Sequence, residues 1–358
     1  SRGGDQAVIK NKFSFDFIGG KSGEVESSNK VRSRVMANAL ESLIKDASRV
    51  LVMGHKFSDM DSIGGAVGIC SLARKNGKSA LIVADTEKSS AKPLIRLLRE
   101  SPEYKEAFIS AQEAIMIADG KTLLVVVDTN RPEQVEDLRL LQSCNHVAVI
   151  DHHRRAATYI DRADLSFIEP YASSVCELMT EILEMCSDEP KLLRCEAEAI
   201  MAGIVLDTKS FTIRTGDRTF DAAAYLRRAG ADTVAVKKLM QNGMEQTVAK
   251  YKILQRAQLY RSMAVAVPET PQNRIVAAQA ADELLNVAGV DASMVMYPTE
   301  DGGVFVSARS IGDVNVQLIM EKLGGGGNRA AAAAQINGLT LKQAVEKLYA
   351  AIDEYIDS

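Results

Sequence analysis

The stretch VLVMGHKFSDMDSIGG, residues 50–65, decides the fold of the first half of this chain. An apolar run, typical of a buried strand, leads directly into His55, Asp59 and Asp61, and a helical pattern follows. The simplest interpretation is a polar loop in which Asp61 or Ser62 caps a helix. That interpretation accounts for only one of three side chains that commonly bind metals. The rest of the chain has to explain the other two.

The alternation of apolar runs and helical segments continues through the first 245 residues. β-Branched apolar runs predict buried parallel strands at 49–54, 79–84, 122–127 and 146–150. The spacing of apolar residues predicts helices at 31–47, near 62–75 and 91–99, and through most of 173–260. We therefore expect residues 31–245 to form a doubly wound α/β domain with a mainly parallel sheet.

The remaining segments have different patterns. Residues 1–30 predict a short strand followed by a linker, and a charged helical pattern predicts a linker helix over 246–262. Residues 263–358 predict a smaller α+β domain. Its strand-like runs are SMAVAV, ASMVMYP and GVFVSARS, and its helical segments are ADELLNVAG, NVQLIMEKLG and the terminal LKQAVEKLYAAIDEYI. The alanines of GGGGNRAAAAAQ, residues 324–335, fit a tightly packed helix that follows four glycines.

The composition excludes several classes of protein. The 358 residues carry a net charge of −4, no Trp and only 5% aromatic residues, which argues against a long nucleic-acid groove but allows a small anionic ligand. No apolar run is long enough to cross a bilayer. The five cysteines show no CxxC spacing, so reduced, packed thiols are expected rather than a zinc knuckle.

Carboxylates and imidazoles gather at the ends of three predicted strands. The first strand leads into His55, Asp59 and Asp61, and the other ends supply Asp128, Asp151, His152 and His153. Because ligands bind beyond the carboxyl ends of parallel strands, these residues should converge. Asp207 comes at the end of a helical pattern. His146 begins a strand, so we expect it to have a structural role and not to bind a metal. Oxygen and imidazole ligands without thiolate favour Mn²⁺ or a related ion, and six ligands fit two metals that share a carboxylate, as in phosphoryl hydrolysis.

These motifs resemble a known family. GHKFSDMDS, VVVDTNRP, VIDHHRR and GIVLDTKSF look like motifs I to IV of the DHH phosphoesterases, in family order, and SARS with GGGGNRAAAAAQI looks like the DHHA1 domain. Within this family the sequences of the motifs are most similar to those of the GdpP/YybT-type cyclic-di-AMP phosphodiesterases. SRGGDQAVIK and FSFDFIGGKSGE resemble the end of the degenerate GGDEF domain that precedes DHH in that group. The parent proteins of that group carry transmembrane helices, so the resemblance implies a cytoplasmic domain of a membrane-anchored bacterial protein.

The resemblance implies hydrolysis of cyclic-di-AMP to 5′-pApA by a hydroxide that two divalent ions, most characteristically Mn²⁺, activate. It assigns the metal ligands as two sets that share Asp128: His55, Asp59 and Asp128, and Asp61, Asp128, His152 and Asp207. Asp151 would orient a neighbouring imidazole. His153 would stabilise the phosphate or protonate the leaving 3′-oxygen. It assigns substrate phosphate to Ser307, Arg309, Gly325, Gly326 and Gly327, with the glycines at a helix start.

One position departs from the family pattern: Asn328 stands where the family usually has His, which bears on substrate affinity.

Several alternatives for the function stay open. The chain could act on pApA, short RNA or pAp, or be a cyclic-dinucleotide receptor without catalysis. The sequence does not distinguish adenine from guanine, and a homodimer is one open oligomeric state. No long nucleic acid and no membrane contact by this fragment are expected.

Overall fold

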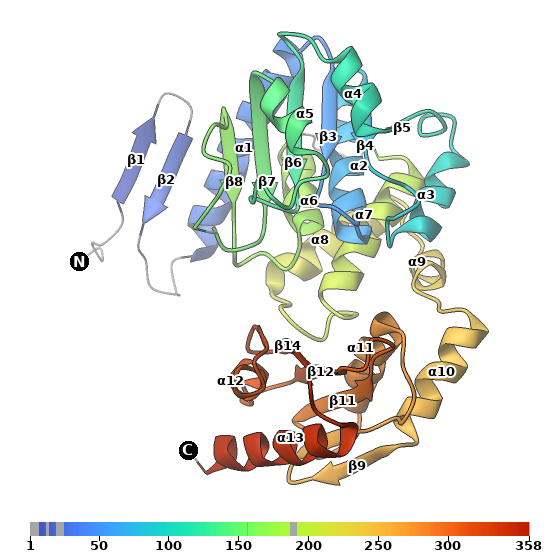
Figure 1. The fold of residues 1–358 in the computed structure, drawn as a ribbon. Coiled ribbons are helices and arrows are strands. Elements are labelled where there is room, and N and C mark those ends of the chain that lie inside the picture. Colours follow the sequence, from blue (N-terminus) through green and yellow to red (C-terminus); the bar gives the residue numbers. More distant parts are fainter. Residues whose placement is uncertain (1–6, 12–13, 19–24, 156, 187–191, 358) are drawn as a thin grey trace. The chain divides into compact units, whose positions relative to one another are not determined.

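The computed structural model describes residues 7–11, 14–18, 25–155, 157–186 and 192–357 (Figure 1). The chain divides into two compact units, Ser1–Gln241 and Asn242–Ser358. Two strands near the start, β1 (Ala7–Asn11) and β2 (Ser14–Ile18), pair antiparallel, where the sequence predicted a single strand. Residues 1–6, 12–13 and 19–24 of the predicted GGDEF remnant and linker (1–30) lie outside the described residues, and the helix predicted to begin at residue 31 begins at residue 25, inside that segment.

Unit 1 is built on a six-stranded sheet in which every strand pair is parallel, as predicted. The order of the strands is β5-β4-β3-β6-β7-β8. Their bounds are β3 Val50–Met53, β4 Ala80–Val83, β5 Phe108–Ile109, β6 Leu123–Val127, β7 His146–Asp151 and β8 Leu165–Ile168. The sequence predicted four of the six, because β5 has only two residues and Ser166 interrupts the apolar run of β8. The fold class is confirmed.

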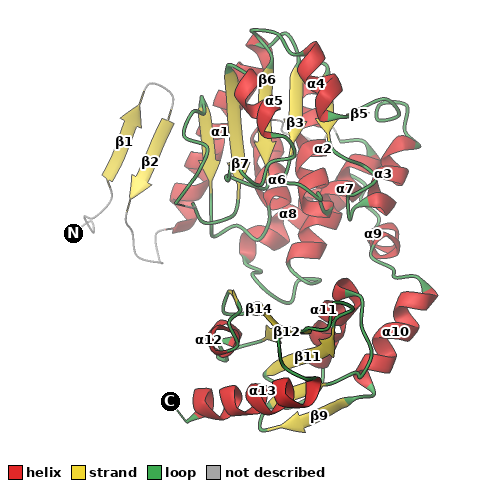
Figure 2. Ribbon diagram, viewed as in Figure 1, coloured by secondary structure: helices red, strands yellow, loops and turns green. Residues whose placement is uncertain are grey.

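Helices cover both faces of this sheet (Figure 2). Alternate strand residues point to opposite faces, so Val50 and Val52 pack into one core and Leu51 and Met53 into the other. The helices of the first core are α1 (Val25–Asp46), α2 (Met60–Lys75), α3 (Lys92–Arg99), α6 (Val175–Cys186), α7 (Arg194–Asp207), α8 (Asp217–Arg228) and α9 (Thr233–Leu239). The second core takes α4 (Ala111–Ile117) and α5 (Leu138–Ser143). None of the helices among the described residues combines the length and apolarity needed to span a membrane.

Small residues bring α2 very close to α6 and α7. A Cβ atom on Gly203 of α7 would lie 2.4 Å from Sγ of Cys176 and 2.8 Å from Cα of Asp61. A Cβ on Gly64 of α2 would lie 2.7 Å from the backbone oxygen of Ala199. Only glycine fits at both positions. The close approach of α7 to α2 leaves Asp61, near the start of α2, fully buried.

Unit 2 contains a second six-stranded sheet, of order β13-β14-β12-β11-β10-β9, in which only β10 and β11 are parallel. The strands are β9 Ala257–Tyr260, β10 Met263–Ala266, β11 Ala292–Pro298, β12 Val304–Ser310, β13 Gly326–Gly327 and β14 Ala331–Ile336. The helices α12 (Val316–Lys322) and α13 (Leu341–Ile356) belong to one core, and α10 (Met244–Leu254) and α11 (Arg274–Leu284) to the other.

Two predictions for this part of the chain are wrong. The charged helix ends at Leu254, and residues 257–260 form β9. The alanine run is strand β14 rather than a helix, because pairing with β12 buries Ala332, Ala334 and Ile336 on one face. Burial against a neighbouring strand thus overrides the high helix propensity of alanine.

Candidate metal centre

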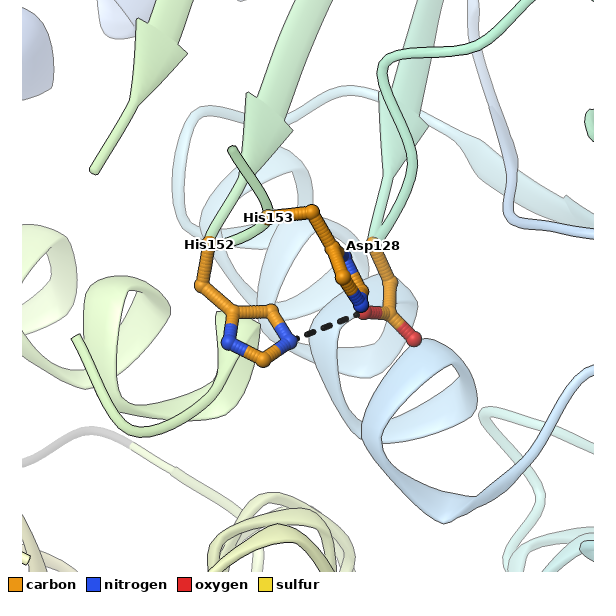
Figure 3. A group of neighbouring side chains, drawn as sticks. All are labelled: Asp128, His152 and His153. Carbon is orange, nitrogen blue, oxygen red and sulfur yellow. Dashed lines mark ion pairs between the residues drawn. The ribbon is translucent and has the colours of Figure 1, made fainter. Parts of the chain in front are cut away.

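The predicted metal ligands of unit 1 meet at the carboxyl ends of β3, β6 and β7. His55 follows β3, Asp128 follows β6, and His152 and His153 follow β7, whose last residue is Asp151. Figure 3 shows Asp128 beside both imidazoles of the β7 end. The left-handed backbone of Asp128, with φ of 61°, is held by its N–H, which donates to the oxygen of Ile150 over 3.0 Å. Such a conformation is uncommon for a residue other than glycine and is frequent at functional sites.

One group of ligand atoms comprises His55, Asp59 and Asp128. Nε2 of His55 lies 3.3 Å from Oδ2 of Asp128 and 3.8 Å from Oδ1 of Asp59. The other ring nitrogen, Nδ1, donates to the backbone oxygen of Lys56 over 2.7 Å, so Nε2 is the nitrogen available to a metal. Asp59 is also the N-cap of α2 and accepts the N–H groups of Asp61 and Ser62. The interpretation that Asp61 or Ser62 caps this helix is therefore wrong.

A second group comprises Asp61, His152 and Asp207, the last residue of α7. Nε2 of His152 lies 3.3 Å from Oδ2 of Asp207, 3.4 Å from Oδ1 of Asp128 and 3.7 Å from Oδ2 of Asp61. Asp61 is completely buried. Its carboxylate accepts two backbone N–H groups at the start of α6, from Val175 at 2.8 Å and Cys176 at 3.0 Å. These charge-assisted bonds fix the carboxylate in place.

A hydrogen bond to Asp151 orients the imidazole of His153. Nδ1–H of His153 donates to Oδ1 of Asp151 over 2.8 Å, and Nδ1 also lies 3.7 Å from Oδ1 of Asp128. The sequence did not single out Asn130, whose amide donates to Oδ2 of Asp151 over 2.5 Å from a buried position. Its place two residues after Asp128 in VVVDTNRP was the only available signal. Burial raises the pKa of Asp151, but the hydrogen bonds from His153 and Asn130 outweigh burial and keep that pKa below its usual value.

The electrostatics of the cluster favour a cation. Burial and the charges of Asp61 and Asp128 raise the pKa of Asp207 to about 8, and burial with the charge of Asp128 also raises the pKa of Asp61. Burial lowers the pKa of His55, but its hydrogen bonds to Asp128 and Asp59 raise it overall to about 11. Carboxylates that must take up protons when they lie together mark a site where positive charge is missing.

The donor set fits a metal. Nε2 of His152 is buried and makes no hydrogen bond to any described residue, although three carboxylates lie within 3.7 Å of it. A buried polar atom without a hydrogen bond is rare unless an ion or water completes it. The nearby thiol of Cys176 belongs to none of the ligand groups among the described residues; it donates to the backbone oxygen of Asp61 over 3.4 Å, and burial raises its pKa well above the usual value. Imidazole and carboxylate ligands therefore remain, a set that suits divalent ions.

A cavity of about 480 Å³ opens beside these groups. Its walls include side chains of both groups together with His153 and the loop residues around Phe57 and Glu133. The full lining is His55, Lys56, Phe57, Asp59, Asp128, Glu133, Gln134, His153 and Asp207. The cavity gives a small ligand direct access to the predicted metal ligands.

The predicted substrate residues of unit 2 lie on and beside two strands, β12 and β13, that both pair with β14. Ser307 and Arg309 are on β12, and Nη1 of Arg309 donates to Oγ of Ser307 over 3.4 Å. Through the strand register, Ser307 faces Ala333 of β14, which in turn pairs with Gly326 of β13. Nε of Arg309 lies 3.3 Å from Oδ1 of Asp282, a partner that the sequence did not indicate.

The expectation that the glycines begin a helix is wrong. They follow the end of α12, and Gly326 and Gly327 form β13. A Cβ on Gly325 would lie 2.1 Å from the oxygen of Ala333, so glycine is required there for the approach to β14. Oδ1 of Asn328 accepts the N–H groups of Ala330 and Ala331, at 3.0 and 2.9 Å, and so closes the turn before β14. Asn328 therefore caps a strand turn, not the helix expected from the sequence.

Comparison with known proteins agrees with this arrangement. Residues 49–204 match the DHH family, N-terminal domain, and residues 262–358 match the DHHA1 domain. The chain is 44% identical to cyclic-di-AMP phosphodiesterase GdpP of Bacillus subtilis and 42% identical to cyclic-di-AMP phosphodiesterase PdeA of Listeria monocytogenes. Both matches cover 99% of this chain and 55% of the relative, so the chain spans about half the length of these curated proteins.

A solved structure supports the fold. The exopolyphosphatase-related protein of Bacteroides fragilis superposes with a TM-score of 0.74 at 18% sequence identity, over 90% of this chain and 96% of that protein. At this identity the similarity concerns the fold alone. Because it covers 90% of this chain, it includes residues of both units.

Proposed function

Since this chain belongs to the DHH family and carries a DHHA1 domain after its DHH domain, we propose that it hydrolyses cyclic-di-AMP to linear 5′-pApA with two divalent ions. The observation that carries this proposal is the 42–44% identity, over 99% of the chain, to relatives named cyclic-di-AMP phosphodiesterases. Nε2 of His152 is buried without a hydrogen bond and lies 3.3–3.7 Å from oxygens of three carboxylates, which supports the metal requirement independently.

In this proposal the ligands form two sets joined by Asp128. One ion would be held by His55, Asp59 and Asp128, and the other by Asp61, Asp128, His152 and Asp207. When bound, the ions would lower the pKa of a water molecule and balance negative charge at phosphorus. Mn²⁺ is the ion we propose, because it accepts mixed imidazole and carboxylate ligands.

His153 is proposed to handle the proton of the leaving group. Because Nδ1–H of His153 donates to Asp151, Nε2 is the ring atom left to donate a proton to the 3′-oxygen as the phosphodiester bond breaks. The hydrogen bond from Asn130 keeps Asp151 ionised and in place, so Asn130 and Asp151 act as positioning residues for this imidazole.

Unit 2 is proposed to bind substrate phosphate. The guanidinium of Arg309 would donate hydrogen bonds to a phosphate, with Ser307 beside it, while Asp282 pairs with Nε. Gly325, Gly326, Gly327 and Asn328 are proposed to complete the phosphate-binding segment, because glycines without side chains let a phosphate come close to the backbone.

The decisive experiment incubates the protein with cyclic-di-AMP and Mn²⁺ and separates the products by chromatography. We expect 5′-pApA as the product and no turnover after chelation. Exclusive cleavage of pApA, pAp or short RNA, or binding of cyclic-di-AMP without turnover, would contradict the proposal. Arg309→Ala should raise KM and leave metal content unchanged, while Lys322→Ala, which removes a cation paired with Glu354 elsewhere in unit 2, should alter neither.

A further inference from the structure

Phe57 is an aromatic side chain exposed in the wall of the metal-centre cavity. The residue is 64% exposed, and it lines the same cavity as His55, Asp59 and Asp128. Large apolar side chains are normally placed where they can be covered, and a ring on the wall of a polar cavity contributes little to the core. Packing therefore does not explain why an aromatic residue stands here.

The backbone of Phe57 is strained as well. Its φ of 59° lies in the left-handed region, where a bulky side chain is a genuine outlier and Asn or Gly is preferred. Hydrogen bonds on both sides hold this conformation. Before it, the N–H of Lys56 donates to the oxygen of Gln134 over 2.8 Å. After it, the oxygen of Ser58 accepts Oγ–H of Ser89 at 2.6 Å and the N–H of Ser90 at 3.0 Å.

A rigid backbone that presents an exposed ring has a clear chemical use. We propose that Phe57 is a stacking platform for a nucleobase of the substrate, so that it favours phosphodiesters that carry bases over those that do not. This inference rests on the proposed function, since it names the recognition of the substrate at the same site. Flat π-faces of purines stack on fixed aromatic rings, and the fixed backbone means that little conformational entropy is lost on binding.

Stacking of this kind is tolerant of base identity, because every base has a π-face. Phe57 therefore contributes affinity for nucleotides as a class and leaves the choice between adenine and guanine to other residues. It is a specificity-determining residue that touches the base, separate from the groups that would act on the phosphate.

The sequence allows a direct binding test, because the chain contains no Trp. Phe57→Trp places a single indole at the proposed platform, and Met116→Trp places a matched one on α4, where Met116 is 72% exposed and does not line the cavity. With Mg²⁺, which is not paramagnetic, we expect AMP to quench the fluorescence of F57W in a saturable way. Ribose 5-phosphate should not quench it, and M116W should respond to neither compound.

A second variant tests the role in hydrolysis. Phe57→Asn keeps a residue that adopts the left-handed conformation readily and removes the ring, so it should fold and melt at a higher temperature than the parent. Metal content should be unchanged, and KM for cyclic-di-AMP should rise about tenfold or more, in line with the loss of one stacked base, with a smaller change in kcat.

The two lines of evidence separate this inference from the proposed function. AMP that competitively inhibits the parent enzyme without quenching F57W, or an unchanged KM in F57N, would overturn the role of Phe57 and leave the phosphodiesterase proposal intact. Absence of any cyclic-di-AMP hydrolysis by the parent would overturn the proposed function. Selective quenching of F57W by AMP would still support Phe57 as the base platform in that case.

Discussion

Oδ1 of Asp128 lies 3.4 Å from Nε2 of His152. The other carboxylate oxygen, Oδ2, lies 3.3 Å from Nε2 of His55, so the two oxygens face the two groups of ligand atoms separately. Among the described residues a third group of candidate ligands comprises Asp128, His152 and His153, so Asp128 belongs to two of the three groups and every other carboxylate to one. This placement, held by the left-handed backbone at Asp128, is the geometric basis for a bridging role.

Asp128→Asn should therefore be the most damaging single change in unit 1. The amide keeps the shape of the carboxylate but removes the negative charge that would lie between two cations, so we expect fewer than two ions per chain and a loss of turnover of at least a hundredfold. Metal analysis by mass spectrometry and steady-state kinetics measure both effects. Asp164→Asn is the control. Oδ2 of Asp164 lies 3.1 Å from Nδ1 of His146, and neither residue lines the cavity. Two ions bound with full activity in D128N would refute the bridge.

Metal uptake should release protons at neutral pH. Without metal, burial and neighbouring carboxylates raise the pKa of Asp207 to about 8, and the hydrogen bonds of His55 overcome burial and raise its pKa to about 11. Both groups must lose a proton to bind a cation, so metal affinity should increase as the pH rises from 6 to 8. Calorimetry in buffers of different ionisation enthalpy measures the number of protons released. An observed heat independent of the buffer would contradict this expectation.

The same pKa shift sets the stability of the metal-free protein. Because the pKa of Asp207 is raised from its ordinary 3.8 to about 8, its contribution to stability is complete below pH 4 and is lost as the pH rises through 8. The melting temperature of the chelated protein should thus fall between pH 6 and 8, and that of the metal-loaded protein should fall less. Asp207→Asn should flatten the profile of the chelated protein, and an unchanged slope in that variant would assign the effect to other groups.

Gly203→Ala should disturb fold and site together. The added methyl group would meet Sγ of Cys176 at 2.4 Å and Cα of Asp61 at 2.8 Å, neither of which is the end of a long flexible side chain. Overpacking of this kind costs about 1–3 kcal/mol of unfolding free energy. We expect a lower midpoint in denaturant and weaker metal binding, since Asp61 must shift. Gly120→Ala, with only one atom at 3.9 Å from the new methyl group, is the control and should change metal affinity little.

Asn328→His should lower stability rather than only change catalysis. The side chain of Asn328 closes the turn before β14 with two hydrogen bonds, and an imidazole cannot accept both N–H groups with the same geometry. Thermal unfolding should show a loss of about 1–2 kcal/mol. Asn328→Asp keeps an oxygen in the same place and should retain most of the stability. Equal melting temperatures for the parent and N328H would show that this turn does not depend on the side chain.

The sequence was sufficient for the four longer apolar strands of the unit 1 sheet and for the convergence of His55, Asp128 and His152, because long β-branched runs and the common edge of parallel strands are local and topological signals. It was not sufficient for contacts that depend on tertiary packing. The bonds from the start of α6 to Asp61 join residues more than a hundred positions apart. The pairing of the alanine run with β12 likewise contradicts its local propensity. The role of Asn130 became evident only from its distance to Asp151.

The position of Asp207 at the last residue of α7 has a consequence for the topology of the chain. His55 and Asp207 are far apart in the sequence of unit 1, Ser1–Gln241, and both line one cavity. Ions bound there would act as a cross-link that closes most of the unit into a loop, in the way that a long-range disulfide does. Such a cross-link would oppose unfolding from either end, and it could form only after the segment up to residue 207 has been synthesised and packed.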